Sequence, residues 1–242
     1  MSDATDVSDG TDAPPAPWTD GEAYLAWLRT RRSVRAFADR PIDRAVLERL
    51  IESAVTAPSN TNRQPWRFAV VTDPARRAAL AGAVKARADE MKAIIARGHH
   101  ADEFGNYGDF FHEPLAAAAA IVIPQYRSYP DLIANFIASG GGDPSRFPTA
   151  AAMQAELCST AGAVMNLLLA AHAHGLGACW MAGPMVARDL IGAQLGIAEP
   201  WRMIGAVALG HPAGATPERP RKPASKVAVW FDGPPGAPDE ER

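Results

Sequence analysis

The sequence predicts an α+β fold, because helix-like and strand-like patterns alternate along one domain-sized chain. With 242 residues, the chain is long enough to bury a core without disulfides or a structural metal. After Asp43, apolar residues recur at the three-to-four spacing of a buried helical face. Residues 68–72 are instead apolar and β-branched, which favours a strand. No internal repeat interrupts this alternation.

The N-terminal half is expected to carry three helices. Residues 20–30 form the first, and Asp43 caps the second. Asp73 and Pro74 predict the start of a third helix that runs to about residue 97, because proline is favoured at the first helical position. The strand at residues 68–72 lies between the second and third helices.

The C-terminal half is expected to be built on one long helix. Residues 150–174 are rich in Ala and Leu and contain no proline, and Gly175 can end a helix in the left-handed conformation. The remaining predicted elements are strands at residues 117–123, 178–181 and 203–209, and a helix after Pro184.

Both ends of the chain are expected to be disordered tails around one folded domain at residues 19–232. Residues 1–18 are rich in Asp, Pro, Ser and Gly, and residues 233–242 have a similar polar, proline-containing composition. Such segments cannot bury enough apolar surface to offset the entropy that is lost on ordering.

Charge and composition argue against several kinds of partner. The net charge of -3 disfavours nucleic acid, because phosphate neutralisation needs a basic excess. The most apolar stretch, residues 115–123, is too short to span a bilayer, and no signal peptide is visible. Cys158 and Cys179 match neither a disulfide framework nor a metal-ligand spacing, which favours a reducing compartment. We therefore expect a cytoplasmic protein without a membrane or nucleic-acid partner.

Common catalytic motifs are absent from the sequence. It contains no G-x-G-x-x-G, no Walker A loop, no H-E-x-x-H and no G-x-S-x-G. His172 and His174 are two residues apart on a predicted helix, so they point to different faces and do not easily share a metal. Such a histidine is expected to be a surface or satisfied core residue, and Cys158 and Cys179 are expected to be buried small hydrophobes. Neither metal nor nucleophile chemistry is predicted.

Three polar clusters remain, and each has a simpler alternative. Arg31, Arg32 and Arg35 lie within five residues and suit phosphate oxygens, or else form a solvated basic turn. Residues 57–66 offer short amides, backbone groups and an indole to a planar heterocycle, or else form a capped turn into a strand. Residues 219–223 hold cations between stiffening prolines as an anion clamp, or else form a disordered basic run.

The exact residue patterns of these clusters and their order along the chain are more informative than any single cluster. R-R-S-V-R-x-F begins at residue 31, and A-P-S-x-x-N-x-Q-P-W-x-F follows at residue 57. G-L-G-A-C-W-M-A-G-P at residues 175–184, a later G-x-P and a basic, proline-containing segment complete the series. Together they resemble the nitroreductase family over residues 23–229.

The resemblance implies a three-layer α+β fold, in which a central, mostly antiparallel sheet is flanked by helices. It also implies an intertwined homodimer that binds FMN at the subunit interface. Arg31, Arg32 and Ser33 would hold the phosphate and ribityl chain, and Arg219 and Arg221 would close on the phosphate from the C-terminal side.

The ring of the cofactor would meet other residues. The resemblance implies that Arg35 lies at the N1 and O2 edge, where a cation stabilises the negative charge that develops when hydride reaches N5. Some relatives carry an acidic residue where this chain has Ala182. The remaining implied contacts are backbone N–H groups of Ala182 and Gly183 near N5, the partner's Pro58, Ser59 and Asn60 against the ring, Asn62 and Gln64 in the same loop, and Asn106 at the pyrimidine edge.

The activity implied by the resemblance is hydride transfer from NAD(P)H through FMN to a small electron-poor acceptor, such as a nitroaromatic or a quinone, by a ping-pong mechanism. No side-chain acid or base is assigned. One alternative is an FMN-dependent dehydrogenase, oxidase or reductive dehalogenase with a dedicated substrate, and another is a flavin-binding protein without turnover. The choice between NADH and NADPH stays open, because the sequence has no dinucleotide fingerprint.

Substrate choice is expected to depend on residues 125–149. This long connection combines Tyr126, Tyr129, Phe136 and Phe147 with a run of three glycines, which is typical of a lid over a site. A passive surface insertion is the alternative. With Trp66 and residues 104–111, the segment is predicted to shape the substrate pocket.

Overall fold

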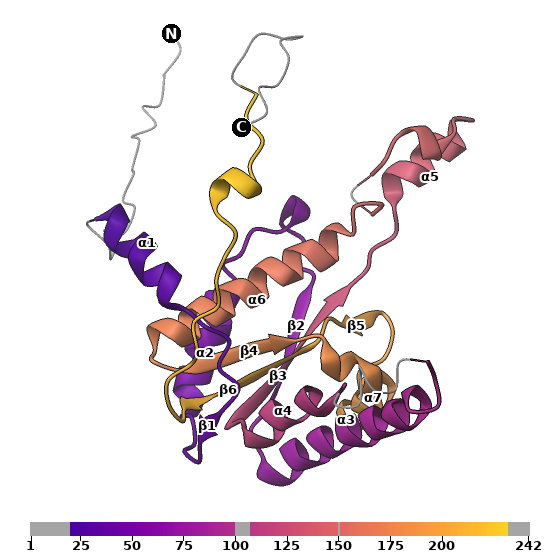
Figure 1. Cartoon of the computed structure of the whole chain (residues 1–242). Helices are drawn as coiled ribbons and strands as arrows, with labels where there is room; N and C mark the ends of the chain where they lie inside the picture. The colour runs from indigo at the N-terminus through magenta and orange to yellow at the C-terminus, as the bar shows by residue number, and fades with distance from the viewer. Residues whose placement is uncertain (1–19, 100–106, 150, 232–242) are drawn as a thin grey trace.

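A sheet lies between two layers of helices in the computed structural model, which describes residues 20–99, 107–149 and 151–231 (Figure 1). The strands are β1 (Phe37–Ala38), β2 (Trp66–Val71), β3 (Ala120–Arg127), β4 (Gly177–Met181), β5 (Trp201–Met203) and β6 (Ala206–Pro212). Within the described ranges they form one six-stranded sheet with the order β1-β6-β3-β2, in which β4 pairs with β6 and β5 with β3. All of these strand pairs are antiparallel, so the predicted fold class is confirmed.

The helices are α1 (Gly21–Thr30), α2 (Arg44–Ala54), α3 (Pro74–Ile95), α4 (Glu113–Ala117), α5 (Leu132–Ser139), α6 (Ala155–Ala173) and α7 (Arg188–Leu195). Short 3-10 turns lie at η1 (Asn60–Asn62), η2 (Asp109–Phe111), η3 (Pro144–Arg146), η4 (Gly183–Ala187) and η5 (Ala224–Lys226). No helix in the described ranges is both long and apolar enough to cross a membrane.

The sheet is covered on both faces, and β3 shows how. Successive side chains of a strand point to opposite faces. Ile121 and Ile123 join one apolar cluster with α3, α4 and α7, whereas Ala120 and Val122 join a second cluster with α2 and α6. Burial on both faces explains why the strand is almost uninterruptedly apolar, and it produces the three layers expected from the resemblance.

Several predicted helix ends are confirmed by their caps. The Asp20 side chain accepts a hydrogen bond from the Glu22 N–H, and that of Asp73 accepts one from the Arg76 N–H. Gly175, just beyond α6, has a φ of +67°, which is costly for residues with a Cβ. Asp43 precedes α2 as predicted, but its side chain makes no capping hydrogen bond.

Three predicted boundaries are wrong. Residues 117–119 lie outside β3, because the alanine-rich stretch first completes α4, and the β-branched residues begin only at Ile121. The central helix begins at Ala155, since Gln154 before it has a left-handed φ of 52°. The strand predicted at residues 203–209 is broken into β5 and β6 at Gly205, whose φ is +119° and whose added Cβ would lie 2.4 Å from the Met181 carbonyl oxygen.

Three segments extend away from the layered body (Figure 1). They are α1, the arm that carries α5, and the C-terminal segment that follows β6. Neither α1 nor α5 contains a buried residue. The predicted tails at residues 1–18 and 233–242 fall outside the described ranges.

Candidate functional site

The first arginine cluster lies on the segment between α1 and β1, which runs beside β4. Ser33 forms a parallel bridge with Ala178, and the Val34 N–H donates to the Ala178 carbonyl at 3.1 Å. The sequence permits this close approach at Gly177, where an added Cβ would lie 2.7 Å from the Val34 side chain. The segment is therefore attached to the sheet by its backbone, and its arginine side chains are presented from a fixed position.

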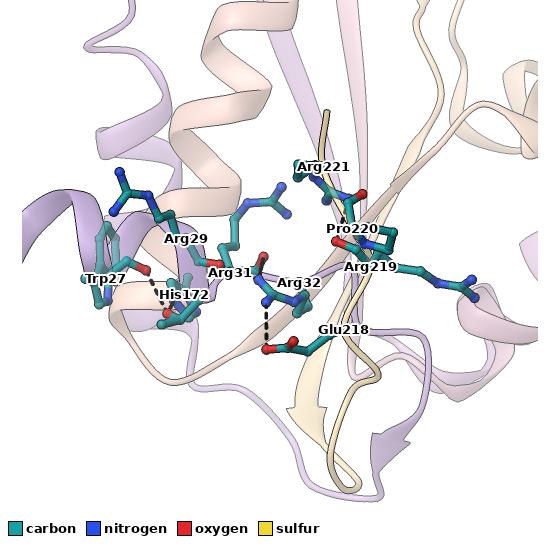
Figure 2. A network of polar contacts seen from close by, with 10 residues as sticks. Trp27, Arg29, Arg31, Arg32, His172, Glu218, Arg219, Pro220 and Arg221 are labelled. Atoms are coloured by element: carbon teal, nitrogen blue, oxygen red, sulfur yellow. Dashed lines mark hydrogen bonds and ion pairs between the residues drawn. The ribbon is translucent and has the colours of Figure 1, made fainter. Parts of the chain in front are cut away.

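The structure brings this cluster together with the C-terminal basic segment, almost two hundred residues later in the chain. Figure 2 shows Arg31 extending toward the C-terminal segment that carries Arg221. Arg32 forms an ion pair of 3.5 Å with Glu218 on the same segment. Arg219 belongs to this segment too, but its side chain points away from Arg31 (Figure 2).

Arg31 lies in an unfavourable environment for a cation. Burial lowers the pKa of its guanidinium, and the positive charges of Arg221 and Arg32 lower it further. Glu218 compensates little, since its side chain is 92% exposed and exposed ion pairs contribute about 0–1 kcal/mol. A multivalent anion between Arg31 and Arg221 would relieve this repulsion, and guanidinium groups match phosphate oxygens. The donor set fits a phosphate.

Arg35 lies two residues after the Ser33 bridge and directly before Ala36, whose carbonyl accepts from the Ala213 N–H. Its guanidinium donates to the Ser33 carbonyl at 3.3 Å, and the side chain is exposed. The neighbouring Cys179 thiol is buried, and burial raises its pKa more than the charges of Arg35 and Arg31 lower it. Cys179 is therefore a neutral core residue, as expected. Cys158 is exposed on α6, so the prediction that it is buried is wrong.

Ala182 and Gly183 lie at the other end of β4, where η4 begins. At about 3.3 Å per residue, they are roughly 13 Å along the strand from Ala178 and the arginine segment. Phe111 packs directly on Gly183, because an added Cβ there would lie 2.3 Å from the ring. The phenyl ring thus forms a wall against this backbone, and it belongs to residues 104–111, the segment predicted to shape the substrate pocket.

The second polar cluster is folded onto the start of α6. The Ser59 hydroxyl accepts from the Gln64 N–H at 3.0 Å, and the Asn60 N–H donates to the Ser159 hydroxyl at 3.3 Å. Gln64 also donates to the Asn62 side chain at 3.2 Å. These bonds hold Asn62 and Gln64 at left-handed φ values of 52° and 47°, so the loop has a defined shape. Pro58 lies exposed at its start.

The two polar ends of α6 do not meet within one chain. Ser159 contacts the Asn60 loop near the start of the helix, whereas His172 contacts α1 near its end. A rise of about 1.5 Å per residue separates these positions by roughly 20 Å. The structure therefore groups Arg31, Arg32, Ser33, Arg35 and Arg221 and leaves the 58–64 loop apart. Asn106 lies outside the described residues.

The segment predicted as a lid is more structured than a loop. Its first residues complete β3, and α5 follows with Asp131 as its N-cap, which accepts from the Ala134 N–H at 3.0 Å. Tyr129 lies between two cations, with the Arg63 and Arg127 guanidinium carbons each 5.2 Å from its ring centroid. Trp66 is not a free surface beside this arm, since it is buried against Ala57 and Ala163. Whether the arm closes over a site stays a prediction.

His172 is a further candidate site residue, although its sequence pattern predicts only a surface or satisfied core histidine. Its ring stacks on Trp27 at a centroid separation of 5.0 Å, and its Nε2 lies 2.8 Å from the Thr30 hydroxyl. Both contacts are in the last turn of α1, immediately before Arg31. The contact joins residues 142 positions apart, and no local pattern in the sequence signals it.

Comparisons with known proteins agree with this geometry. The family model described as "Nitroreductase family" matches residues 28–211. A NADH dehydrogenase from Thermus thermophilus is 29% identical over 215 residues, which cover 86% of this chain and 96% of that protein. An iodotyrosine deiodinase from Haliscomenobacter hydrossis is 31% identical over 112 residues, which cover 46% of this chain and only half (50%) of that protein.

Solved structures show the same fold. A BluB-like flavoprotein from Clostridium difficile 630 has a TM-score of 0.76 at 20% identity, covering 86% of this chain and 98% of its own. A putative nitroreductase from Desulfovibrio desulfuricans, solved in complex with FMN, has a TM-score of 0.60 at 22% identity, covering 87% and 97%.

The contact between Gly183 and Phe111 gives a direct test of the wall beside β4. Gly183→Ala should lower the free energy of unfolding by about 1–3 kcal/mol, because the added methyl group overlaps the ring. Urea unfolding measures this loss. Combining Gly183→Ala with Phe111→Leu should recover part of it, and Ala182→Ser at the exposed neighbour serves as the control. An additive double variant would contradict the proposed contact.

Proposed function

The chain belongs to the nitroreductase family, and on this basis we propose that it is an FMN-dependent oxidoreductase that works as a homodimer. The observation that carries the proposal is the convergence of Arg31 and Arg221, two cations that disfavour each other unless an anion lies between them. A flavin mononucleotide carries such an anion at one end and its reactive ring at the other. When bound, FMN supplies the redox chemistry.

The arrangement along β4 supports an orientation for the cofactor. Arg31, Arg32, Ser33 and Arg221 would hold the phosphate end and the ribityl chain. Arg219 is a weaker candidate for the phosphate, since its side chain points away from Arg31 (Figure 2). The positions of the phosphate ligands at one end of β4 and of η4 at the other suit a molecule that lies along the strand.

Two further groups would meet the ring. Arg35 would place its positive charge at the N1 and O2 edge, where it stabilises negative charge that develops during reduction. The backbone N–H groups of Ala182 and Gly183 would face N5. The methyl group of Ala182 cannot act as an acid. The nicotinamide would therefore be oriented by backbone groups and by packing.

The length of α6 supports the proposed homodimer. The loop of residues 58–64 is preorganised by its own hydrogen bonds, yet it lies at the opposite end of α6 from the last turn of α1. We propose that Pro58, Ser59 and Asn60 complete the flavin pocket of the partner subunit, with Asn62 and Gln64 in the same loop. Asn106 stays a proposed contact at the pyrimidine edge.

The proposed reaction is a ping-pong transfer from NAD(P)H to a small electron-poor acceptor at one shared face. The likeness to a NADH dehydrogenase over nearly the whole chain supports a nicotinamide donor. The second candidate is a reductive dehalogenase or another enzyme with a dedicated substrate, supported by the likeness to an iodotyrosine deiodinase over half of that protein.

The absorbance spectrum of the purified protein tests the cofactor, and anaerobic titration with NADH and NADPH then tests the donor. We expect a yellow protein that bleaches with one or both nicotinamides. A folded preparation that stays colourless and does not bind added FMN would contradict the proposal. A yellow protein that neither nicotinamide bleaches would support flavin binding but contradict the proposed reductase activity.

Steady-state kinetics test the shared face. If the nicotinamide leaves before the acceptor binds, double-reciprocal plots at several acceptor concentrations should be parallel. Menadione, a quinone, is a suitable acceptor for the measurement. Intersecting lines would show that donor and acceptor bind together, and they would rule out a single shared site.

Arg35→Ala tests the electrostatic role of the exposed arginine beside β4. Loss of a cation near the developing charge should slow flavin reduction by at least about tenfold, which corresponds to about 1.4 kcal/mol. The Kd for FMN should change by less than about threefold, because the phosphate ligands are intact. Stopped-flow reduction measures the rate, and Arg40→Ala at an exposed position outside this group is the control. An unchanged rate would show that Arg35 has no such role.

A further inference from the structure

The last turn of α1 is attached to the body of the protein through His172. The Thr30 hydroxyl donates to the Trp27 carbonyl at 2.7 Å, so its oxygen is free to accept from His172 Nε2 at 2.8 Å. This direction of donation places the proton of the neutral imidazole on Nε2. The imidazole also stacks on the Trp27 indole, with an angle of 28° between the ring planes. One side chain of α6 thus holds two residues of α1.

Close packing does not provide this attachment. None of the residues of α1 is buried. A cavity of about 370 Å³ lies between Arg31 and Arg32 on one side and Leu168 and Leu176 on the other. His172 and Thr30 line the same cavity. The backbone pairing with β4 begins only at Ser33, so the direction of the last turn of α1, which comes before it, depends on the polar and stacking contacts with His172.

Arg31 and Arg32 follow Thr30 directly. A change in the direction of the last helical turn would therefore move both guanidinium groups relative to Arg221. We propose that His172 is a positioning residue for the flavin phosphate: through Thr30 and Trp27 it fixes the turn from which the phosphate-binding arginines extend, and its own charge is coupled to phosphate binding. This inference rests on the proposed FMN site.

The charge coupling follows from the groups around the ring. The charges of Arg31 and Arg32 act on the imidazole, and Arg29, Glu218 and Arg221 belong to the surrounding network of polar contacts (Figure 2). Burial lowers the pKa of His172, a hydrogen bond to the Trp27 backbone partly offsets this, and the charges of Arg31 and Arg32 lower the pKa further. A phosphate dianion beside the arginines offsets their field and raises this pKa, so FMN binding should take up a proton at His172.

Protonation does not break the attachment. The imidazolium still donates from Nε2 to Thr30, since the second proton is added at Nδ1. The sign of the effect is therefore defined. Lowering the pH adds a positive charge near the phosphate without releasing α1, and the His172 contribution to FMN affinity should grow as the pH falls.

The test compares FMN with riboflavin, which has the same ring but no phosphate. In His172→Gln, the Kd for FMN should rise at least about tenfold, while the Kd for riboflavin should stay within about twofold of the wild type. Thr30→Val, which replaces the hydroxyl with a methyl group, should act in the same direction by a smaller factor. His174→Gln, at an exposed position two residues away, is the matched control and should change neither Kd.

The proton coupling is measured in the same binding experiment at several pH values. The ratio of the FMN Kd of His172→Gln to that of the wild type should increase between about pH 8 and pH 6. Taking the ratio removes the titration of the phosphate itself, which both proteins share. A ratio that does not change with pH would overturn the coupling.

Equal losses of FMN and riboflavin affinity would show a general structural role and would overturn the positioning role. Wild-type affinity for FMN in His172→Gln and Thr30→Val would overturn it as well, while leaving the proposed flavin enzyme intact. A wild-type protein that binds neither compound would instead contradict the proposed function. Thr30→Val supplies the same comparison if His172→Gln does not fold.

Discussion

The candidate site depends on the pairing of residues 33 and 34 with β4. This short parallel contact fixes the backbone that carries Arg31, Arg32 and Arg35 against β4, a largely buried strand that pairs with β6. Because the same strand continues to Ala182, one rigid element sets the spacing between the cationic end and the η4 end of the site. A small displacement of either end would require a change in the sheet itself, which packed cores resist.

A second constraint is the length of α6. Its two ends carry polar contacts of different kinds, with the Asn60 loop at one end and α1 at the other. A helix cannot shorten, so these contacts cannot converge within one chain. The 58–64 loop and the arginine segment therefore stay apart within one chain, which is the observation on which the proposed homodimer rests. The projecting α1, α5 arm and C-terminal segment agree with a chain that makes contacts beyond its own body (Figure 1).

The sequence predicts the structural features that depend on neighbouring residues. It does not predict those that depend on contacts between residues far apart in the chain. The alternation of helices and strands, the start of α3 at Asp73, and the end of α6 at Gly175 were all predictable from local patterns. The break at Gly205 was not, because it depends on the Met181 carbonyl across the sheet. The arginine clusters are identifiable from their sequence motifs. The contact of His172 with α1, in contrast, depends on residues 142 positions apart.

The two leading arginines of the cluster have different local roles. The Arg32 guanidinium donates to the carbonyls of Arg29 and Arg31 and pairs with Glu218. Cations at the end of a helix stabilise its unpaired carbonyls, so Arg32 acts first as a cap of α1. Arg31 has no ion pair within the described part of the chain. A phosphate would therefore contact Arg32, which already donates to backbone carbonyls, and Arg31, whose charge is uncompensated. The second gains more from binding, because an anion removes its repulsion from Arg221.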